Sequence, residues 1–202
     1  MFALVENNQF IKIVNSNKGI TIGENQYPKS IFSLWSNSER EAIGIYEVVV
    51  DNTNLKDQEY WINTNMTYTF ADGVVTGSYG TATARPLDDV LFVEGDEIPS
   101  DKAVGDVKQQ GLKGQKIKVI KEQAGGLLAP TDWHVIKEVE TSDYVVPTEI
   151  TDYRTQVRAK SNEMETQINA CTTVDELKAL YEYTEQENGT FTRPLAEFPE
   201  EL

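Results

Sequence analysis

The residues best suited to chemistry in this chain are acidic side chains between positions 88 and 97. Asp88, Asp89, Glu94, Asp96 and Glu97 could supply oxygen ligands for a hard cation. Their spacing does not follow an EF-hand loop, which needs acids at alternate positions and a closing glutamate. We therefore interpret the segment as a solvated acidic loop and predict no metal site.

The chain has one histidine, His134, and one cysteine, Cys171. A zinc site of cysteines and histidines needs about four ligands, so this composition excludes one. A single cysteine also excludes an internal disulfide, and Cys171 is predicted to be a small buried apolar residue. Any nucleophilic triad would have to use His134, which lies beside Trp133 with no nucleophile motif nearby. We predict no catalytic residue.

Sequence motifs of the common enzyme classes are missing. The chain has no P-loop, no dinucleotide-binding glycine motif, no GxSxG and no HExxH. Acid pairs such as Glu138 and Glu140 could in principle hydrolyse a glycan, but acidic proteins contain many such pairs by chance. We expect a non-enzymatic protein without a cofactor, and a hydrolase without a recognisable motif is the least favoured alternative.

Composition narrows the possible partners. The 202 residues carry a net charge of −15, with 39% hydrophobic and 25% charged residues, which is typical of a globular protein. Such a charge disfavours nucleic acid and anionic membranes as partners. The one basic stretch, residues 108–121, could meet an acidic neighbour, although a solvated face is the preferred interpretation. No apolar run suggests membrane insertion, and no secretory signal is visible, so synthesis in the cytoplasm is expected.

An α+β fold is predicted, with a β-rich N-terminal domain over residues 1–87 followed by a C-terminal helical region. Residues 6–9 and the pair Asp72-Gly73 predict hairpins, since Asp and Gly tolerate positive φ. Ser36 and Glu39 have capping-box spacing before a short helix, and residues 46–50 are typical of a strand. The aromatic residues of this half could form a carbohydrate platform, but a packed sheet face is favoured.

Three segments are expected after the β-rich domain. Residues 88–112 form an acidic-to-basic connection, residues 113–181 are mainly helical, and residues 182–202 form an acidic tail. The pair Gly125-Gly126 is expected to end the first helix, and residues 132–140 could be strand or helix. The tail should be flexible unless it docks on the body or binds a neighbouring subunit.

A long helix is predicted after Pro147. Four residues recur every seven positions along it and two more flank them, namely Ile150, Val157, Met164 and Cys171 with Tyr153 and Ile168. Packing within the protein is the favoured interpretation of this apolar stripe, and an oligomer seam is the alternative. The capping-box pair Thr173 and Glu176 begins a second helix, predicted to form a helical hairpin with the first through residues 170–172.

Residues 125–158, GGLLAPTDWHVIKEVETSDYVVPTEITDYRTQVR, couple a buried-looking Trp133 to a helix that carries Tyr153, Arg154 and Arg158. This segment resembles the C-terminal region of tailed-bacteriophage tail proteins, namely tail-fibre assembly proteins and fibre- or baseplate-associated proteins. Residues 27–46, with Tyr-Pro, Leu-Trp-Ser, Glu-Arg and Ala-Ile-Gly-Ile-Tyr, are also similar to N-terminal segments of phage tail proteins.

The resemblance implies a structural component of a phage tail, synthesised in the host cytoplasm and located in the virion. Its partners would be other tail proteins of the fibre or baseplate, with a homo-oligomer possible. A tail-fibre assembly chaperone that leaves before the virion matures is the alternative. We expect Arg154 and Arg158 to reach acids such as Glu138 or Glu140. The residues expected to bind partners or to organise the C-terminal unit are Trp133, Tyr153, Arg154, Val157, Arg158, Met164 and Ile168.

Overall fold

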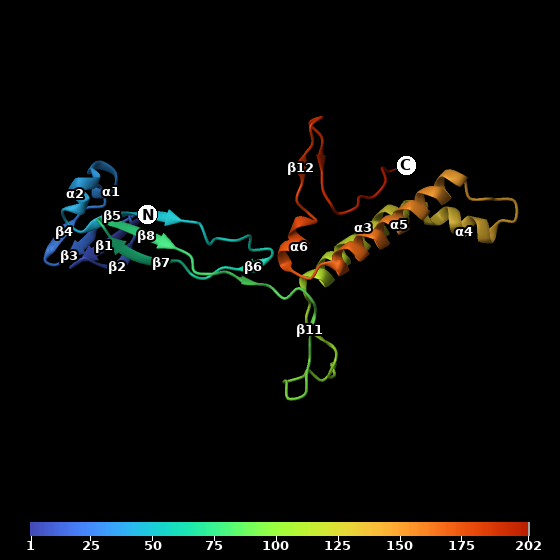
Figure 1. The fold of residues 1–202 in the computed structure, drawn as a ribbon, viewed down its shortest axis with the longest axis horizontal. Coiled ribbons are helices and arrows are strands. Elements are labelled where there is room, and N and C mark those ends of the chain that lie inside the picture. The colour runs from blue at the N-terminus through green and yellow to red at the C-terminus, as the bar shows by residue number, and fades with distance from the viewer. Residues whose placement is uncertain (202) are drawn as a thin grey trace. The chain divides into compact units, whose positions relative to one another are not determined.

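The computed structural model describes residues 1–201, which form two compact units, residues 1–83 and residues 84–201. The N-terminal unit is built on a β-sheet, and the C-terminal unit contains long helices (Figure 1). The predicted α+β class is therefore confirmed. Within residues 1–201, no helix combines the length and apolar character needed to cross a membrane.

The N-terminal unit contains nearly all of the regular β-structure. Its elements are β1 (Phe2–Glu6), β2 (Gln9–Val14), β3 (Ile20–Ile22), β4 (Asn25–Tyr27), α1 (Ile31–Leu34), α2 (Asn37–Glu41), β5 (Ile45–Asp51), β6 (Trp61–Ile62), β7 (Thr67–Ala71) and β8 (Val74–Ser78). Strand β6 pairs with β9 (Thr83–Ala84) in a two-stranded sheet.

Five of these strands make one sheet in the order β2-β1-β5-β8-β7. All neighbours are antiparallel except β5 and β8, which are parallel with Val48 opposite Val75. The sheet curls so that its two outer strands approach each other, and Phe10 of β2 stacks on Tyr68 of β7 with ring centroids 5.0 Å apart. This curl gives the sheet an enclosed face.

Two hairpins of this sheet have the turns that the sequence predicts. Asn7 and Asn8 adopt φ of 51° and 59°, and Asp72 and Gly73 adopt φ of 50° and 79°. Two consecutive residues with positive φ match the right-handed twist of the flanking strands. Both predicted hairpins are confirmed.

Apolar residues pack on both faces of the sheet. On one face the buried residues are Ala3, Val5, Val48 and Val75, with Phe10, Tyr46, Tyr68 and Phe70 against them. On the other face they are Leu4, Val14 and Ile45, with Phe2, Ile20, Ile22, Phe32 and Ile43 against them. The hairpin β3–β4 and helix α1 therefore cover the second face, and the aromatic residues of the first face belong to the core.

The connection from α2 to β5 depends on a capping box and a glycine. Ser36 Oγ accepts from the Glu39 amide, and the Glu39 carboxylate accepts from the Ser36 amide at 2.8 Å, as the spacing predicts. Gly44 then ends the helical segment at φ +80°, and its carbonyl accepts from the Val5 amide at 2.8 Å. A Cβ at this glycine would lie 2.5 Å from the Val5 carbonyl oxygen.

Replacing Gly44 by alanine should destabilise the N-terminal unit by about 2 to 3 kcal/mol, because left-handed strain adds to the clash with the Val5 carbonyl. Denaturant unfolding followed by tryptophan fluorescence measures the loss, since Trp35 and Trp61 lie in this unit. Gly23→Ala is the matched control, because Gly23 has φ +59° but nothing within 4 Å of its Cβ position. Equal losses for the two variants would show that the close approach to Val5 has no effect.

The C-terminal unit is organised around helices. Its elements are β10 (Val90–Leu91), β11 (Val107–Gln109), α3 (Leu112–Leu128), the 3-10 turn η1 (Ala129–Thr131), α4 (Asp132–Glu140), α5 (Thr148–Ala170), α6 (Val174–Ala179), β12 (Thr184–Glu185) and β13 (Phe191–Thr192). The predicted long helix after Pro147 is α5, and residues 132–140, which periodicity left open, are helical.

Helix α5 packs along α3, and the predicted apolar stripe forms its buried side. Tyr153 and Val157 meet Ala124 of α3, with Leu127 and Leu128 beside them. Packing within the chain is thus the observed use of the stripe. We expected the long helix to form a helical hairpin with the short helix α6. This prediction was wrong about the partner, because the helix that mainly packs against α5 is α3.

The expected end of α3 at Gly125-Gly126 was also wrong. Both glycines lie inside the helix, which continues to Leu128. Two helical glycines cost about 1 kcal/mol each relative to alanine. Leu127 and Leu128 pack against the Tyr153 and Val157 cluster, and this burial outweighs the weak helix preference of the glycines.

The predicted capping box at α6 is confirmed. Hydrogen bonds from Thr172 and Thr173 lower the pKa of Glu176 from its ordinary value of 4.5. The main cause is the hydrogen bond from the Thr172 amide at 2.6 Å, followed by the bond from the Thr172 hydroxyl at 2.9 Å. The Thr173 amide also donates to this carboxylate at 3.2 Å. The ionised form of Glu176 therefore holds the turn between α5 and α6.

Acid should weaken this turn, and Glu176→Gln should remove part of the acid sensitivity. Because the folded pKa is depressed, the stabilisation is complete above the ordinary value of 4.5 and is lost as the pH falls through the folded pKa. Thermal unfolding at about pH 6 and about pH 3 should differ less for the variant than for the native chain. Glu187→Gln, which removes a charge from an exposed loop, is the control and should behave as the native chain does.

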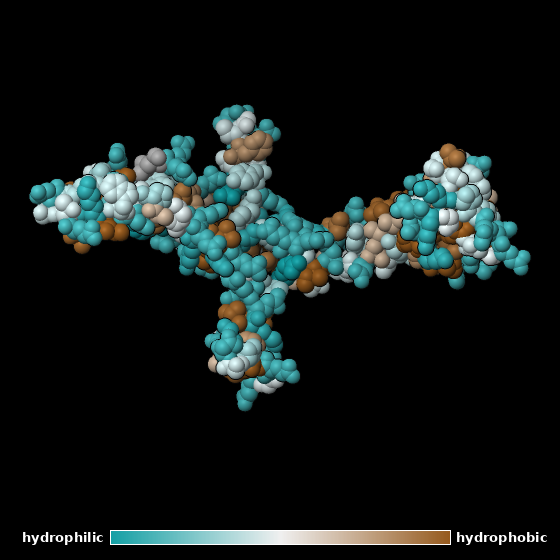
Figure 2. Space-filling view, turned by 180° about the vertical axis from the view of Figure 1, so that it is seen from behind, coloured by the Kyte–Doolittle hydropathy of each residue, from teal (hydrophilic) through white to brown (hydrophobic). Residues whose placement is uncertain are grey.

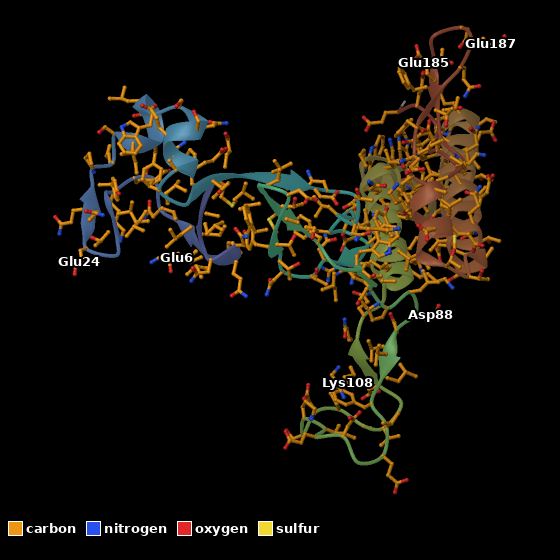
Figure 3. All side chains as sticks on the ribbon, turned by 60° about the vertical axis from the view of Figure 1, so that its left-hand side comes forward. Glu6, Glu24, Asp88, Lys108, Glu185 and Glu187 are labelled. Carbon is orange, nitrogen blue, oxygen red and sulfur yellow. The ribbon has the colours of Figure 1, made fainter. Side chains whose placement is uncertain are left out.

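The segment predicted as a connection, residues 88–112, contains the hairpin β10–β11. Its base is fixed to the start of α3, because the Leu112 and Lys113 amides donate to the Pro86 and Leu87 carbonyls. Figure 3 shows Asp88 at this base and Lys108 further along the hairpin, which leads away from the helices. The composition correctly indicated a solvated segment but not its strand pairing.

The acidic tail docks on the long helix. The Gln167 side chain donates to the Pro194 carbonyl at 3.0 Å and accepts from the Ala196 amide at 2.9 Å. Leu195 is buried, and its amide donates to the Leu180 carbonyl. Before this anchor the tail forms the hairpin β12–β13, where Glu185 and Glu187 lie (Figure 3). The tail was expected to dock on the body of the chain or to bind a neighbouring subunit, and docking on the body is what the structure shows.

Candidate protein-binding surface

The turn between α3 and α4 is organised by Arg154 of α5. Its guanidinium donates to the Leu128 carbonyl at 3.0 Å, to Thr131 Oγ1 at 2.6 Å and to Asp132 Oδ1 at 2.8 Å. Arg154 is only 8% exposed, and Thr131 is buried with it. One side chain thus satisfies the end of α3, the turn η1 and the first residue of α4.

The expected acidic partners of the two arginines were wrong. Arg154 pairs with Asp132 rather than with Glu138 or Glu140. The Glu138 carboxylate instead accepts from the Val146 amide at 3.0 Å, and so fixes the loop between α4 and α5. Arg158 lies one turn beyond Arg154 and donates at 3.5 Å to the Arg154 carbonyl. Within residues 1–201, no carboxylate pairs with Arg158.

Helix α4 has no buried residue, although its apolar side chains share one face. At about 100° per residue, Val135, Val139, Ile136 and Trp133 fall on one continuous arc of the helix. Val139 is 84% and Trp133 52% exposed, so the expected burial of Trp133 was wrong. Figure 2 shows apolar residues at the surface of this end of the helical unit, at the left of that view.

Aromatic contacts attach the following loop to α4 at the edge of the apolar arc, where Trp133 lies. The rings of Trp133 and His134 stack with centroids 3.7 Å apart, and His134 Nδ1 shares a hydrogen bond with the Tyr144 hydroxyl. Lys137 lies 4.3 Å above the Tyr144 ring. His134 therefore binds Tyr144 in the structure, a structural contact that sequence reasoning did not find.

An open groove of about 480 Å³ runs between α4, its loop and α5. Its aliphatic wall consists of Val135, Val145 and Val146, and its polar side includes Glu138, Thr151, Arg154, Thr155 and Arg158. Arg154 is paired with Asp132 and Glu138 binds the Val146 amide, whereas Arg158 makes one long hydrogen bond to the Arg154 carbonyl. Arg158 is therefore the charged group of the groove that is most open to a ligand.

The remaining residues expected at the site lie in the core of the helical unit. Tyr153 and Val157 are buried on α5 beside Arg154 and Arg158, and Met164 and Ile168 are buried further along the same helix. Sequence reasoning missed Val139, Ile136 and Thr131. The helical period of apolar residues within 132–140 could have indicated the first two, but the segment was not assigned as a helix.

Three of the five acidic residues considered for a cation site, Asp88, Asp89 and Asp96, have partners within the helical unit. Asp96 binds Lys108 Nζ at 2.7 Å and accepts from the Val93 amide, and these bonds lower its pKa, with the Lys108 bond the larger cause. Asp88 binds Lys113 Nζ at 2.9 Å, and Asp89 accepts from the Gly111 amide. Across residues 1–201, no three metal-ligating side chains gather into a cluster.

Cys171 is buried where α5 ends. Burial is the main cause that raises the pKa of its thiol, and the nearby Glu176 carboxylate adds to the effect. Its Sγ contacts the Gln167 carbonyl at 3.5 Å. The thiol is therefore held protonated, as expected of a packed apolar residue.

Comparison with protein-family models, curated proteins and solved structures finds no match to this chain.

Proposed function

We propose that this chain is a structural, protein-binding component of a tailed-phage virion, associated with the tail fibre or the baseplate. It acts through contacts with other tail proteins and catalyses no reaction. Two lines of argument support the proposal. The protein-binding role rests on the amount of surface that the chain leaves uncovered, and the assignment to a phage tail rests on the resemblance of residues 125–158 and 27–46.

The exposed surface is the observation that carries the binding role. The chain exposes 13429 Å². The scaling of surface with mass gives about 9,500 Å² for one compact body of this size, and about 11,500 Å² for two compact units that do not touch. The excess over the larger figure is roughly 2,000 Å², which exceeds the area of about 800 Å² that each partner contributes to a standard protein–protein interface.

Projecting segments of the helical unit contribute to this exposed surface. Two hairpins, β10–β11 and β12–β13, carry exposed apolar residues such as Leu91, Val107 and Phe191, and the apolar arc of α4 is uncovered as well. A two-stranded hairpin has little stability by itself in water. Subunits of large assemblies use such projecting segments to bind their neighbours, where the apolar residues become covered.

Quantitative mass spectrometry of purified virions tests the proposal. The chain should be present in a fixed ratio to the tail proteins, and gold-labelled antibodies should bind the tail. If it is missing from mature particles while fibres fail to fold in its absence, the assembly chaperone is the correct function. If the chain is missing from mature particles and the fibres fold normally without it, it is neither a virion component nor a fibre assembly chaperone.

Turnover is a separate test of the non-enzymatic role. We expect no release of sugar from bacterial surface glycan by the purified chain. Release that is lost when Glu138 and Glu140 are replaced by glutamine would contradict the proposal.

A further inference from the structure

The groove between α4 and α5 combines aliphatic walls with one available guanidinium. Val135, Val145 and Val146 supply the wall. Within residues 1–201, Arg158 has no carboxylate partner and makes one long hydrogen bond, from its Nη1 to the Arg154 carbonyl at 3.5 Å. An arginine fork binds a carboxylate through two parallel hydrogen bonds. The groove therefore fits a segment in which acidic and aliphatic side chains alternate closely.

This chain carries such a segment at the end of the β10–β11 hairpin. Val93 is largely exposed there, and Glu94 and Glu97 are exposed beside it with no pairing to any described residue. The loop itself is held in shape, because Asp96 binds Lys108 and accepts from the Val93 amide. The charge and the apolar content of this tip complement those of the groove.

The tip and the groove of one chain lie at opposite ends of α3. The hairpin is fixed to the first turn of α3 through the Leu112 and Lys113 amides, whereas α4 follows the last turn (Figure 1). Seventeen helical residues separate these ends by about 25 Å. Since the base of the hairpin is anchored and its strands lead away from the helices, the tip cannot fill its own groove.

We propose that the β10–β11 tip of one copy binds the α4–α5 groove of a second copy, with Glu94 or Glu97 paired to Arg158. The two surfaces differ, so the contact is head-to-tail, and a bound pair still offers one free tip and one free groove. Repetition of such a contact produces a ring if the rotation closes and a filament if it does not. This goes beyond the proposed function, because it concerns self-assembly whatever the particle in which the chain works.

Charge reversal on the two sides tests the pairing. Sedimentation analysis of the native chain at about 0.15 M salt, where repulsion between the acidic bodies is screened, should show concentration-dependent oligomers. Arg158→Glu alone and Glu94→Lys with Glu97→Lys alone should each weaken association by at least about tenfold. An equal mixture of the two variants should regain native association, because each tip again meets a groove of opposite charge.

Three results would overturn the proposal: a native chain that stays monomeric, a variant that associates as the native chain does, or a mixture that does not recover. The substituted side chains are all exposed, and circular dichroism verifies that each variant is folded.

Cross-linking provides a second test that does not rely on charge reversal, in case a charge-reversed variant does not fold. Chains with Cys171→Ala and either Glu97→Cys or Arg158→Cys should form a disulfide-linked dimer when mixed under mild oxidation. Glu24→Cys, at an exposed position of the N-terminal unit, replaces Glu97→Cys in the control and should give no more than background. Equal cross-linking of the two pairs would contradict the proposed contact.

Discussion

Replacing Arg154 by methionine is expected to destabilise the helical unit by about 3 kcal/mol. The side chain is nearly buried, and its removal leaves the Leu128 carbonyl and Thr131 Oγ1 without a charged donor. Loss of one partner of a buried ion pair costs about 3 to 5 kcal/mol. We choose the lower end, because the Asp132 side chain is 55% exposed and water can replace part of its interaction.

Urea unfolding followed by far-ultraviolet circular dichroism measures this effect, since most of the helix lies in the C-terminal unit. Arg154→Lys keeps the charge but cannot reach all three acceptors, so an intermediate loss is expected. Arg158→Ala is the matched control from the next turn of α5. It should change the free energy of unfolding by less than about 0.5 kcal/mol. A loss for Arg158→Ala as large as that for Arg154→Met would show that Arg154 has no special role.

Ile168→Ala is expected to cost about 2 to 5 kcal/mol, because Ile168 is 0% exposed and its truncation leaves a cavity in the core of the helical unit. The same substitution at Ile136 of α4 should change stability by less than about 0.5 kcal/mol, since that side chain is 56% exposed. Thermal unfolding of both variants gives the comparison.

This contrast separates two kinds of apolar stripe. The stripe of α5 is used inside the chain, whereas the arc of α4 remains at the surface. If Ile136→Ala were as damaging as Ile168→Ala, α4 would be packed in solution and its face would not be available for partners. A small effect on stability with weaker binding to tail proteins would support the proposed function.

The sequence predicted those features that depend on neighbouring residues. The hairpin at Asp72-Gly73 follows from the conformations that these residues tolerate, and the capping boxes at Ser36 and Thr173 from a spacing of three. The buried side of α5 follows from its heptad spacing. In each case the information lies within a few residues of the element that it specifies.

Features that depend on distant contacts could not be predicted in this way. Periodicity shows which side of α5 is buried, but not that α3 covers it. The pair Gly125-Gly126 favours a helix end locally, and only contacts of Leu127 and Leu128 with α5 keep the helix intact. Trp133 is apolar enough to be buried, yet Arg154 and Asp132 orient α4 so that its apolar arc faces outward.

The parallel pairing of β5 with β8 also determines the order in which the sheet can be completed during synthesis. Strand β5 lies in the middle of the sheet, but its neighbour β8 is the last of the five strands of this sheet to be synthesised. Until residue 78 has emerged, a nascent chain presents Val48 on an open edge that is able to pair with another nascent chain. Rapid translation through residues 52–78 would shorten the time for which this edge is exposed. Many ribosomes on one messenger RNA would bring nascent chains close together and make pairing between their exposed edges more frequent.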